Sequence, residues 1–153
     1  MKVSKVYQAN AESLFDFLKA SFKNDYERNT NKLLRSGDLK PGLKFTKTFG
    51  AKNQNSVLVE VEHMTAPHHY SILLKSSRGS NVIEYLIEPV TDGEIEVTYR
   101  EEYINTGFFT KMNNLILGPL FRKKLEGRML AQLDQLIAYS NKERADYVKP
   151  NIS

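Results

Sequence analysis

The order of hydrophobic patterns is the feature that most constrains the fold of this 153-residue chain. One strand-like run comes first, a helical stretch follows, and five further runs alternate apolar with polar residues. A long apolar and amphipathic stretch over 108–140 comes next. Period-two alternation with one apolar face is typical of an antiparallel sheet that is solvated on its other face. The order therefore predicts an α+β domain in which a curved antiparallel sheet of about six strands wraps around a long C-terminal helix.

The start of the chain predicts a strand over 2–8, followed by one or two short helices. Asn10 is a suitable N-cap for the first helix. The apolar side chains after it recur at helical spacing: Leu14, Phe15, Leu18 and Phe22. We predict that this helix ends near Asn24 and that a second short helix covers 26–35.

Turn residues then separate five runs with strand-like alternation. The predicted strands cover 43–49, 56–63, 67–75, 82–88 and 94–104. A helix is predicted from Leu120 to Ser140, with Pro119 in its first turn, where a proline is tolerated. Its length would be roughly 30 Å at 1.5 Å per residue. We expect a single domain over 1–140 and a C-terminal tail over 141–153.

Composition excludes several classes of protein. No run approaches the roughly 20 apolar residues that a membrane helix needs, and the first residues do not resemble a signal peptide, so we expect a cytoplasmic protein. The chain has no cysteine, which excludes disulfides, thiolate catalysis and thiolate metal sites.

Charge is distributed unevenly along the sequence. Residues 1–52 carry 11 Lys and Arg against 5 Asp and Glu, residues 53–107 carry 3 against 9, and residues 108–153 carry 8 against 4. The strand-rich middle is therefore acidic, whereas a sheet that bound nucleic acid would need the opposite sign. We expect no nucleic-acid partner and predict that the acidic residues occupy the solvated face of the sheet.

Two stretches resemble a known superfamily. The residues from Val6 to Leu18 (VYQANAESLFDFL) and from Glu101 to Phe109 (EEYINTGFF) are similar to the opening and to the last strand of the START-like, polyketide-cyclase-like (SRPBCC) helix-grip superfamily. The resemblance extends over about 2–140 and is strongest to a family of small bacterial proteins of unknown function. The superfamily includes lipid carriers, hormone receptors, cyclases, toxin-like proteins and chaperone regulators, so the fold alone implies no single function.

In the helix-grip fold, the concave face of the sheet and the inner side of the C-terminal helix line a cavity. The residues that we expect to line it are Val59, Val61, His63, Tyr70, Ile72, Tyr85, Ile87, Val97, Tyr99, Glu101, Tyr103, Phe121, Leu125 and Met129. Apolar walls with a few polar groups are typical of a small-molecule pocket. The alternative is a solid core in which each tyrosine hydroxyl reaches water or a carbonyl.

Glu101 is unusual, because alternation places it on the apolar side of its strand with Tyr99 and Tyr103. A carboxyl group buried without a partner has a raised pKa, and it can donate a proton or anchor a ligand. The alternative is a register slip or bulge that moves Glu101 to solvent.

The three histidines are close in the sequence. His68 and His69 are adjacent and point to opposite faces of a strand, so a metal would have His63 and one of them at most. We therefore predict no metal site. A contact between His63 and Glu101 remains an open alternative, as an acid–base pair or as a structural pair. The sequence contains no nucleophile elbow, Walker loop or dinucleotide-binding glycine motif, so we expect no cofactor.

The stretch over 108–124 joins an apolar run to a basic cluster. The cluster consists of Arg122, Lys123, Lys124 and Arg128. This combination can contact an anionic membrane surface weakly, while stable membrane insertion is not expected. The alternative, which we favour, is that the run covers the mouth of the cavity; its apolar residues can also form a homodimer contact.

We predict from the sequence that the chain binds a small hydrophobic molecule or lipid without catalysing a reaction. The second hypothesis is a protein-interaction module or homodimer without a ligand. The third is a cyclase-like or hydrolase-like enzyme that uses Glu101 as a general acid or base.

Overall fold

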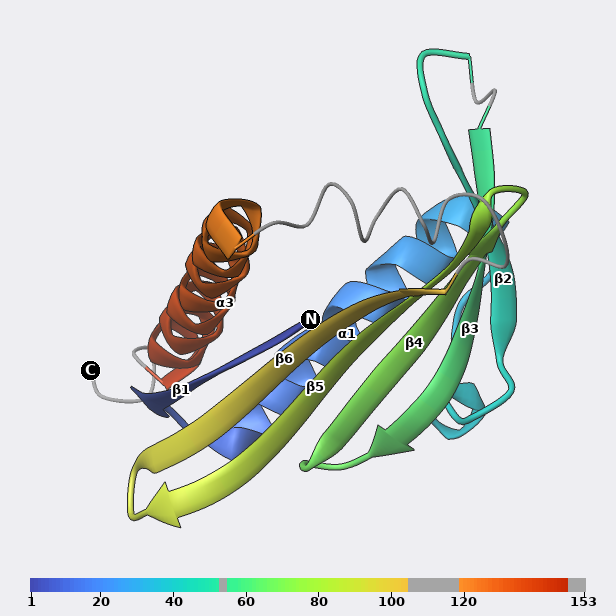
Figure 1. The fold of residues 1–153 in the computed structure, drawn as a ribbon. Helices are drawn as coiled ribbons and strands as arrows, with labels where there is room; N and C mark the ends of the chain where they lie inside the picture. The colour runs from blue at the N-terminus through green and yellow to red at the C-terminus, as the bar shows by residue number, and fades with distance from the viewer. Residues whose placement is uncertain (53–54, 105–118, 149–153) are drawn as a thin grey trace.

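A six-stranded antiparallel sheet with two long helices forms the computed structural model, which describes residues 1–52, 55–104 and 119–148 (Figure 1). The elements in chain order are β1 (Lys2–Gln8), α1 (Ala11–Thr30), the short 3-10 helix η1 (Ser36–Asp38), β2 (Lys44–Phe49), β3 (Asn55–Thr65), β4 (His69–Ser76), β5 (Gly79–Thr91), β6 (Glu94–Ile104) and α3 (Pro119–Val148). The strand order is β1-β6-β5-β4-β3-β2. The predicted α+β class with a curved antiparallel sheet and a C-terminal helix is confirmed.

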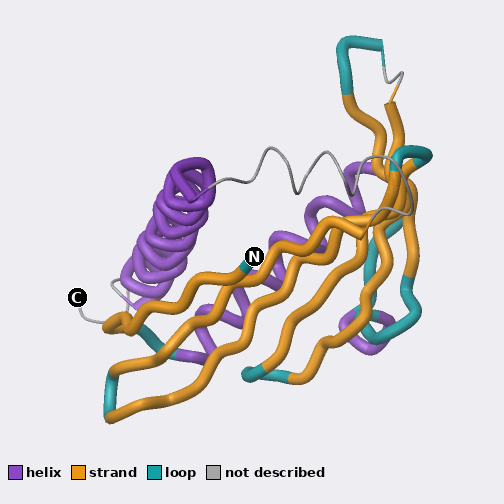
Figure 2. Tube along the Cα trace, viewed as in Figure 1, coloured by secondary structure: helices purple, strands orange, loops and turns teal. Residues whose placement is uncertain are grey.

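Both long helices pack on the same face of the sheet, which we call the concave face. Figures 1 and 2 show α1 running behind the strands and α3 lying alongside β1. The first strand pairs with the last one, since Val3 lies opposite Tyr99 in the register. The sheet therefore begins with β1 beneath α3 and ends with β2 beneath α1.

Helix α1 is one continuous helix, and the prediction of a break near Asn24 is wrong. The Asn10 side chain caps it by accepting a hydrogen bond from the Ser13 backbone N–H at 2.9 Å, as predicted. The apolar spacing continues to Tyr26, whose ring contacts Phe45 at 5.4 Å between centroids. Neither glycine nor proline interrupts this stretch. The helix ends at Thr30, and the next residue, Asn31, is the C-cap and adopts the left-handed conformation that is common at helix ends.

Strand boundaries differ from the predictions at the hairpins. The strands over 2–8 and 94–104 are confirmed, while β3 and β5 are longer than predicted. Strand β4 begins at His69, because residues 66–68 form the turn after β3, where the His68 N–H donates to the Thr65 carbonyl at 2.9 Å. The hairpin between β5 and β6 turns at Asp92 and Gly93, and the positive φ of Gly93 (81°) is readily adopted by glycine.

A β-bulge in β3 changes which side chains face the helices. Val61 lies opposite Ile72, but the next paired residue is His63, opposite Ser71. The extra residue, Glu62, shifts the alternation by one position. His63 is therefore exposed on the convex face, on the other side from Tyr70 and Ile72.

The core consists of two clusters on the concave face. The first joins α3 and the start of α1 to β1, β5 and β6 and includes Phe15, Val97 and Met129. The second joins the end of α1 to β2 and β3 through Phe22 and Phe45, whose rings contact at 5.5 Å. Helix α1 takes part in both clusters and links the two halves of the sheet.

Helix α3 begins at Pro119, consistent with the predicted role of this proline in the first turn. It continues to Val148, so the predicted end at Ser140 is wrong. No glycine or proline follows before Pro150, and the Asn141 side chain donates a hydrogen bond to the Gln8 carbonyl at 3.1 Å. Residues 105–118, where a cavity lid or dimer contact was predicted, lie outside the described ranges. Among the residues described, no helix has the length and apolar character needed to cross a membrane.

Polar contacts attach α3 to β1. Asp134 accepts hydrogen bonds from the Tyr7 hydroxyl at 2.6 Å and from the Lys5 ammonium at 3.0 Å. These two donors lower the pKa of Asp134. Burial and the nearby carboxylate raise the pKa of Tyr7, so its hydroxyl remains a donor at neutral pH. These contacts join α3 to β1 on the face of the sheet where Met129, Leu133 and Ile137 are buried.

Replacing Met129 with alanine tests the packing of α3. Met129 is 1% exposed, so Met129→Ala should lower the free energy of unfolding by about 2–5 kcal/mol, because it removes buried methylene groups and leaves a cavity. Urea unfolding followed by circular dichroism measures this change. The control Gln132→Ala lies on the exposed side of the same helix and should change stability by less than about 0.5 kcal/mol. Equal effects of the two variants would contradict this placement of α3.

Candidate functional site

A cavity of about 520 Å³ lies between the concave face of the sheet and α1. Its lining residues come from α1 and from five strands: Ser21, Phe22, Asp25, Lys47, Phe49, Val57, Val59, Tyr70, Ile72, Leu74, Ser76, Gly79, Asn81, Ile83 and Tyr103. The wall opposite the sheet is thus formed by α1. The prediction that α3 forms this wall through Leu125 and Met129 is not supported for this cavity.

The apolar walls result from strand alternation and register. Val59 lies opposite Leu74 across β3 and β4, and Ile72 lies opposite Ile83 across β4 and β5. Side chains at such paired positions emerge on the same face of the sheet. Phe22 faces them from α1. The cavity therefore has hydrophobic surfaces on both of its principal sides.

Tyrosines at one level of three neighbouring strands form a row next to the cavity. Tyr70, Tyr85 and Tyr99 lie opposite one another in the register of β4, β5 and β6. The rings of Tyr85 and Tyr99 stack at 4.9 Å, those of Tyr70 and Tyr85 are 5.9 Å apart, and Phe15 contacts Tyr70 edge-on at 6.3 Å. Burial raises the pKa of all three tyrosines, to about 12 for Tyr85. Their hydroxyls are neutral at physiological pH.

Glu101 lies on the concave face with Tyr99, as alternation predicts. The Tyr99 hydroxyl donates a hydrogen bond to the Glu101 carboxylate, and burial together with this bond raises the pKa of Tyr99. Glu101 is half-buried and is not among the residues that line the cavity. The predicted alternative contact with His63 is wrong, because His63 is on the convex face and β3 is separated from β6 by two strands.

Charged and polar groups occupy parts of the cavity lining. The Lys47 ammonium on β2 donates to the Asp25 carboxylate on α1 at 2.8 Å, and these side chains are 41% and 31% exposed, so the pair lies at the rim. Tyr103 lines the cavity from β6, but the residue is exposed and its hydroxyl donates to the Arg78 carbonyl at 2.8 Å. Tyr70, in contrast, is buried.

The predicted lining residues separate into distinct groups. Four of them line the cavity: Val59, Tyr70, Ile72 and Tyr103. Five are buried in the core clusters: Val61, Ile87, Val97, Tyr99 and Met129. Tyr85 and Leu125 are partly buried against the first cluster. Glu101 accepts its hydrogen bond from Tyr99, His63 is on the convex face, and the Phe121 side chain lies outside the described part of the chain.

Several lining residues were missed. Leu74 and Ile83 continue the alternation of Tyr70, Ile72 and Tyr85, so the pattern contained the signal for them. The α1 residues Ser21, Phe22 and Asp25 were missed because the C-terminal helix was expected to form that wall. The proximity of Asp25 to Lys47, 22 residues later in the sequence, has no periodic signal.

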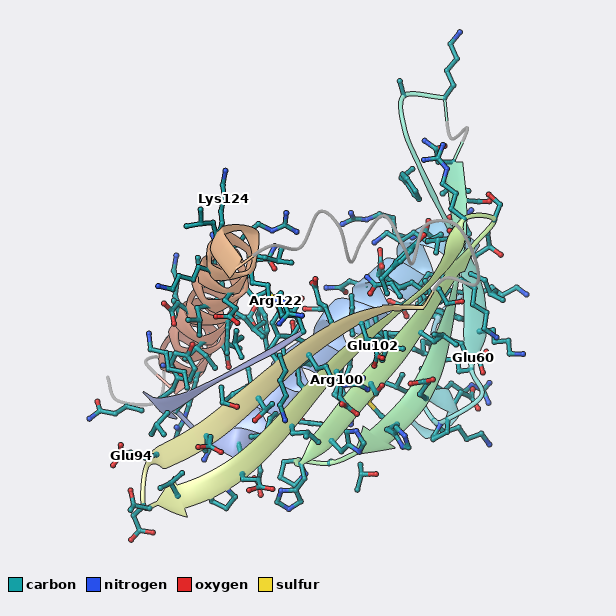
Figure 3. All side chains as sticks on the ribbon, viewed as in Figure 1. Glu60, Glu94, Arg100, Glu102, Arg122 and Lys124 are labelled. Atoms are coloured by element: carbon teal, nitrogen blue, oxygen red, sulfur yellow. The ribbon has the colours of Figure 1, made fainter. Side chains whose placement is uncertain are left out.

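The convex face carries a charged network. Glu84 accepts hydrogen bonds from Arg100 at 2.8 Å and from His69 at 2.7 Å, and the rings of His63 and His69 stack at 4.3 Å. Figure 3 shows the neighbouring Arg100 and Glu102 side chains on β6. Burial opposes ionisation of Glu84, but the bonds from Arg100 and His69 outweigh it and lower the pKa. Among the described residues, no three His, Cys, Asp or Glu side chains are arranged to hold a metal ion.

The Glu84 network should make stability depend on pH. Glu84→Gln removes the charge that Arg100 and His69 contact, so we expect a loss of about 1–3 kcal/mol at pH 7. Because the pKa of Glu84 is lower in the folded protein, its contribution is present above the unfolded pKa and is lost as the pH falls through the folded pKa. Urea unfolding at pH 7 and pH 3 should therefore show a smaller difference between wild type and variant at pH 3.

The matched control is Glu96→Gln, which changes an exposed glutamate on β6. We expect it to alter the unfolding free energy by less than about 0.5 kcal/mol at pH 7. A Glu84→Gln difference that stayed constant between the two pH values would contradict the assigned role of the carboxylate.

Solved structures share this fold. A point mutant of norcoclaurine synthase from Thalictrum flavum in complex with a transition-state analogue has a TM-score of 0.61 at 12% identity, over 94% of each chain. Ara h 8.0201 has a TM-score of 0.59 at 10% identity, covering 93% of this chain and 97% of its own. A START superfamily protein from Mycobacterium smegmatis has a TM-score of 0.46 at 18% identity, covering 96% and 98%. The first two structures confirm the predicted helix-grip fold, and at these identities the likeness concerns the fold alone.

Sequence comparison provides a family match. Residues 1–122 match the family described as "Domain of unknown function (DUF3284)". No curated protein sequence matches the chain.

Proposed function

The chain belongs to the DUF3284 family, and we propose that it binds a small hydrophobic molecule or lipid non-covalently in the cavity between the sheet and α1. The observation that carries this proposal is the cavity of about 520 Å³ with apolar side chains from β3, β4, β5 and α1. Its volume is within the range of about 300–1,000 Å³ that is common for ligand pockets. Enclosure of the ligand would provide most of the affinity, at roughly 25 cal/mol per Å² of buried apolar surface.

The composition of the lining supports a mostly apolar ligand. Ile72, Leu74 and Ile83 form its sheet side, while the Asp25–Lys47 ion pair lies at the rim. A charged group deep in the cavity would lose hydration without gaining a counter-charge from these walls. A neutral molecule with a large apolar surface therefore fits the cavity best.

The structural comparison is compatible with this proposal. The norcoclaurine synthase that shares the fold holds a transition-state analogue. That protein is an enzyme, but its identity to this chain is only 12%, so the likeness concerns the fold. In this chain Glu101, the residue considered as a general acid or base, accepts a hydrogen bond from Tyr99 and does not line the cavity. We therefore propose binding rather than catalysis.

A tryptophan placed in the cavity tests the site. Ile72→Trp should fill part of the space and abolish binding, because the larger ring takes the volume that the ligand needs. The control Leu73→Trp adds the same side chain at the next residue of β4, which faces the convex side opposite Glu60 and Val82. Native mass spectrometry after incubation with a total lipid and metabolite extract should detect a stoichiometric adduct on wild type and Leu73→Trp and none on Ile72→Trp.

Two outcomes would contradict the proposal. An equal adduct on Ile72→Trp and wild type would place the ligand elsewhere. The absence of an adduct on wild type would argue against binding of any ligand in the extract. Far-UV circular dichroism of both variants verifies that the fold is retained.

A further inference from the structure

The hydroxyl of Tyr70 is a buried polar group whose partner is missing from the described part of the chain. Tyr70 is 5% exposed and lines the cavity. Its ring contacts Phe15 and Tyr85, but its hydroxyl forms no hydrogen bond with any described residue. Leaving such a group without a partner costs about 1–3 kcal/mol. A ligand that supplies the missing hydrogen bond would recover this free energy.

The hydroxyls of three other tyrosines donate hydrogen bonds to oxygen acceptors. Tyr7 donates to Asp134, Tyr99 donates to Glu101, and Tyr103 donates to the Arg78 carbonyl. Each of these hydroxyls has an oxygen acceptor from another residue. Tyr70 and Tyr85 have no such acceptor among the described residues, and of these two only Tyr70 lines the cavity.

Packing fixes the position of the Tyr70 ring. Phe15 contacts it edge-on at 6.3 Å from α1, and Tyr85 lies 5.9 Å away on β5. Both neighbours belong to or pack against the first core cluster. The hydroxyl is therefore held in place before a ligand binds, which lowers the entropic cost of forming a directional hydrogen bond.

The surroundings also define the chemical character of the group that the hydroxyl would meet. Burial, followed by the nearby Tyr85 and the Asp25 carboxylate, raises the pKa of Tyr70. The phenol keeps its proton and can donate it to an acceptor. A carboxylate or phosphate on the ligand would lose its hydration to the apolar walls, and the Lys47 ammonium at the rim is already paired with Asp25. A carbonyl or ether oxygen carries no charge to desolvate.

We propose that the ligand is a neutral apolar molecule with a carbonyl or ether oxygen that accepts a hydrogen bond from the Tyr70 hydroxyl. This inference rests on the proposed function and adds the chemical class of the ligand. Phe15 and Tyr85 position the hydroxyl, and Ile72, Leu74 and Ile83 contact the apolar body of the molecule.

The test uses two probes of nearly equal shape, 2-acetonaphthone and 2-isopropenylnaphthalene. They differ in that a carbonyl oxygen of the first is replaced by a methylene group in the second. Equilibrium dialysis gives the Kd of each probe for wild type and for Tyr70→Phe. We expect Tyr70→Phe to raise the Kd of 2-acetonaphthone by about 5- to 10-fold. The Kd of 2-isopropenylnaphthalene should stay within about twofold of its wild-type value.

Tyr139→Phe is the matched control. It removes a hydroxyl from an exposed ring on α3 that does not line the cavity, and it should change neither Kd by more than about twofold. Tyr70→Phe keeps the aromatic ring and its contact with Phe15, and thermal unfolding of both variants verifies that the fold is intact.

The outcomes separate the two proposals. If both probes bind wild type, lose affinity in Ile72→Trp, and bind Tyr70→Phe unchanged, the role of the Tyr70 hydroxyl is wrong while the proposed cavity stands. If Tyr70→Phe raised the Kd of both probes by the same factor, the hydrogen-bond assignment would also be wrong, because the effect would not depend on the carbonyl oxygen. If neither probe binds wild type, both the assignment and the proposed binding of neutral apolar molecules are contradicted.

Discussion

The packing of α1 on the concave face is the interaction on which the other features depend. Leu14, Phe15, Leu18 and Phe22 are buried along one side of this helix. Phe15 contacts Tyr70 in the middle of the sheet, and Phe22 contacts Phe45 near its β2 edge. Helix α1 therefore holds the two halves of the curved sheet together and also forms one wall of the cavity. A mutation that moved α1 would alter the core and the candidate site at the same time.

Helix α3 has a different role in the described structure. Met129, Leu133 and Ile137 complete the first core cluster, and Asp134 attaches the helix to Tyr7 and Lys5 on β1. These contacts place α3 toward the β1 side of the sheet, away from β2 and β3. The concave face beneath the second half of α1 is thus left to the cavity. Because α3 completes the core and α1 covers the cavity, the fold has both a well-packed core and an adjoining cavity.

Much of the fold could be predicted because its signals are local. Asn10 was identified as an N-cap, and the strands over 2–8 and 94–104 were predicted with the observed boundaries. Alternation also placed Tyr99 and Glu101 on the same face. The candidate site was predicted less completely: Val59, Tyr70, Ile72 and Tyr103 line the cavity, but Phe22 and Asp25 were missed. These residues were missed because the C-terminal helix was expected to form the wall opposite the sheet. The periodicity of a helix does not indicate which strands it will cover.

The sequence by itself determined the number and order of the strands, the side of each regular strand that is apolar, and the start of α1, because these depend on residues a few positions apart. Tertiary structure decided the rest. Contacts between residues distant in the sequence position the helices: Phe15 packs on Tyr70 for α1, and Met129 is buried in the first core cluster for α3. The bulge beside Glu62 moved His63 to the convex face. Which residues surround the cavity was settled by these long-range contacts, because packing between elements follows from their three-dimensional shapes and leaves no repeat in the chain.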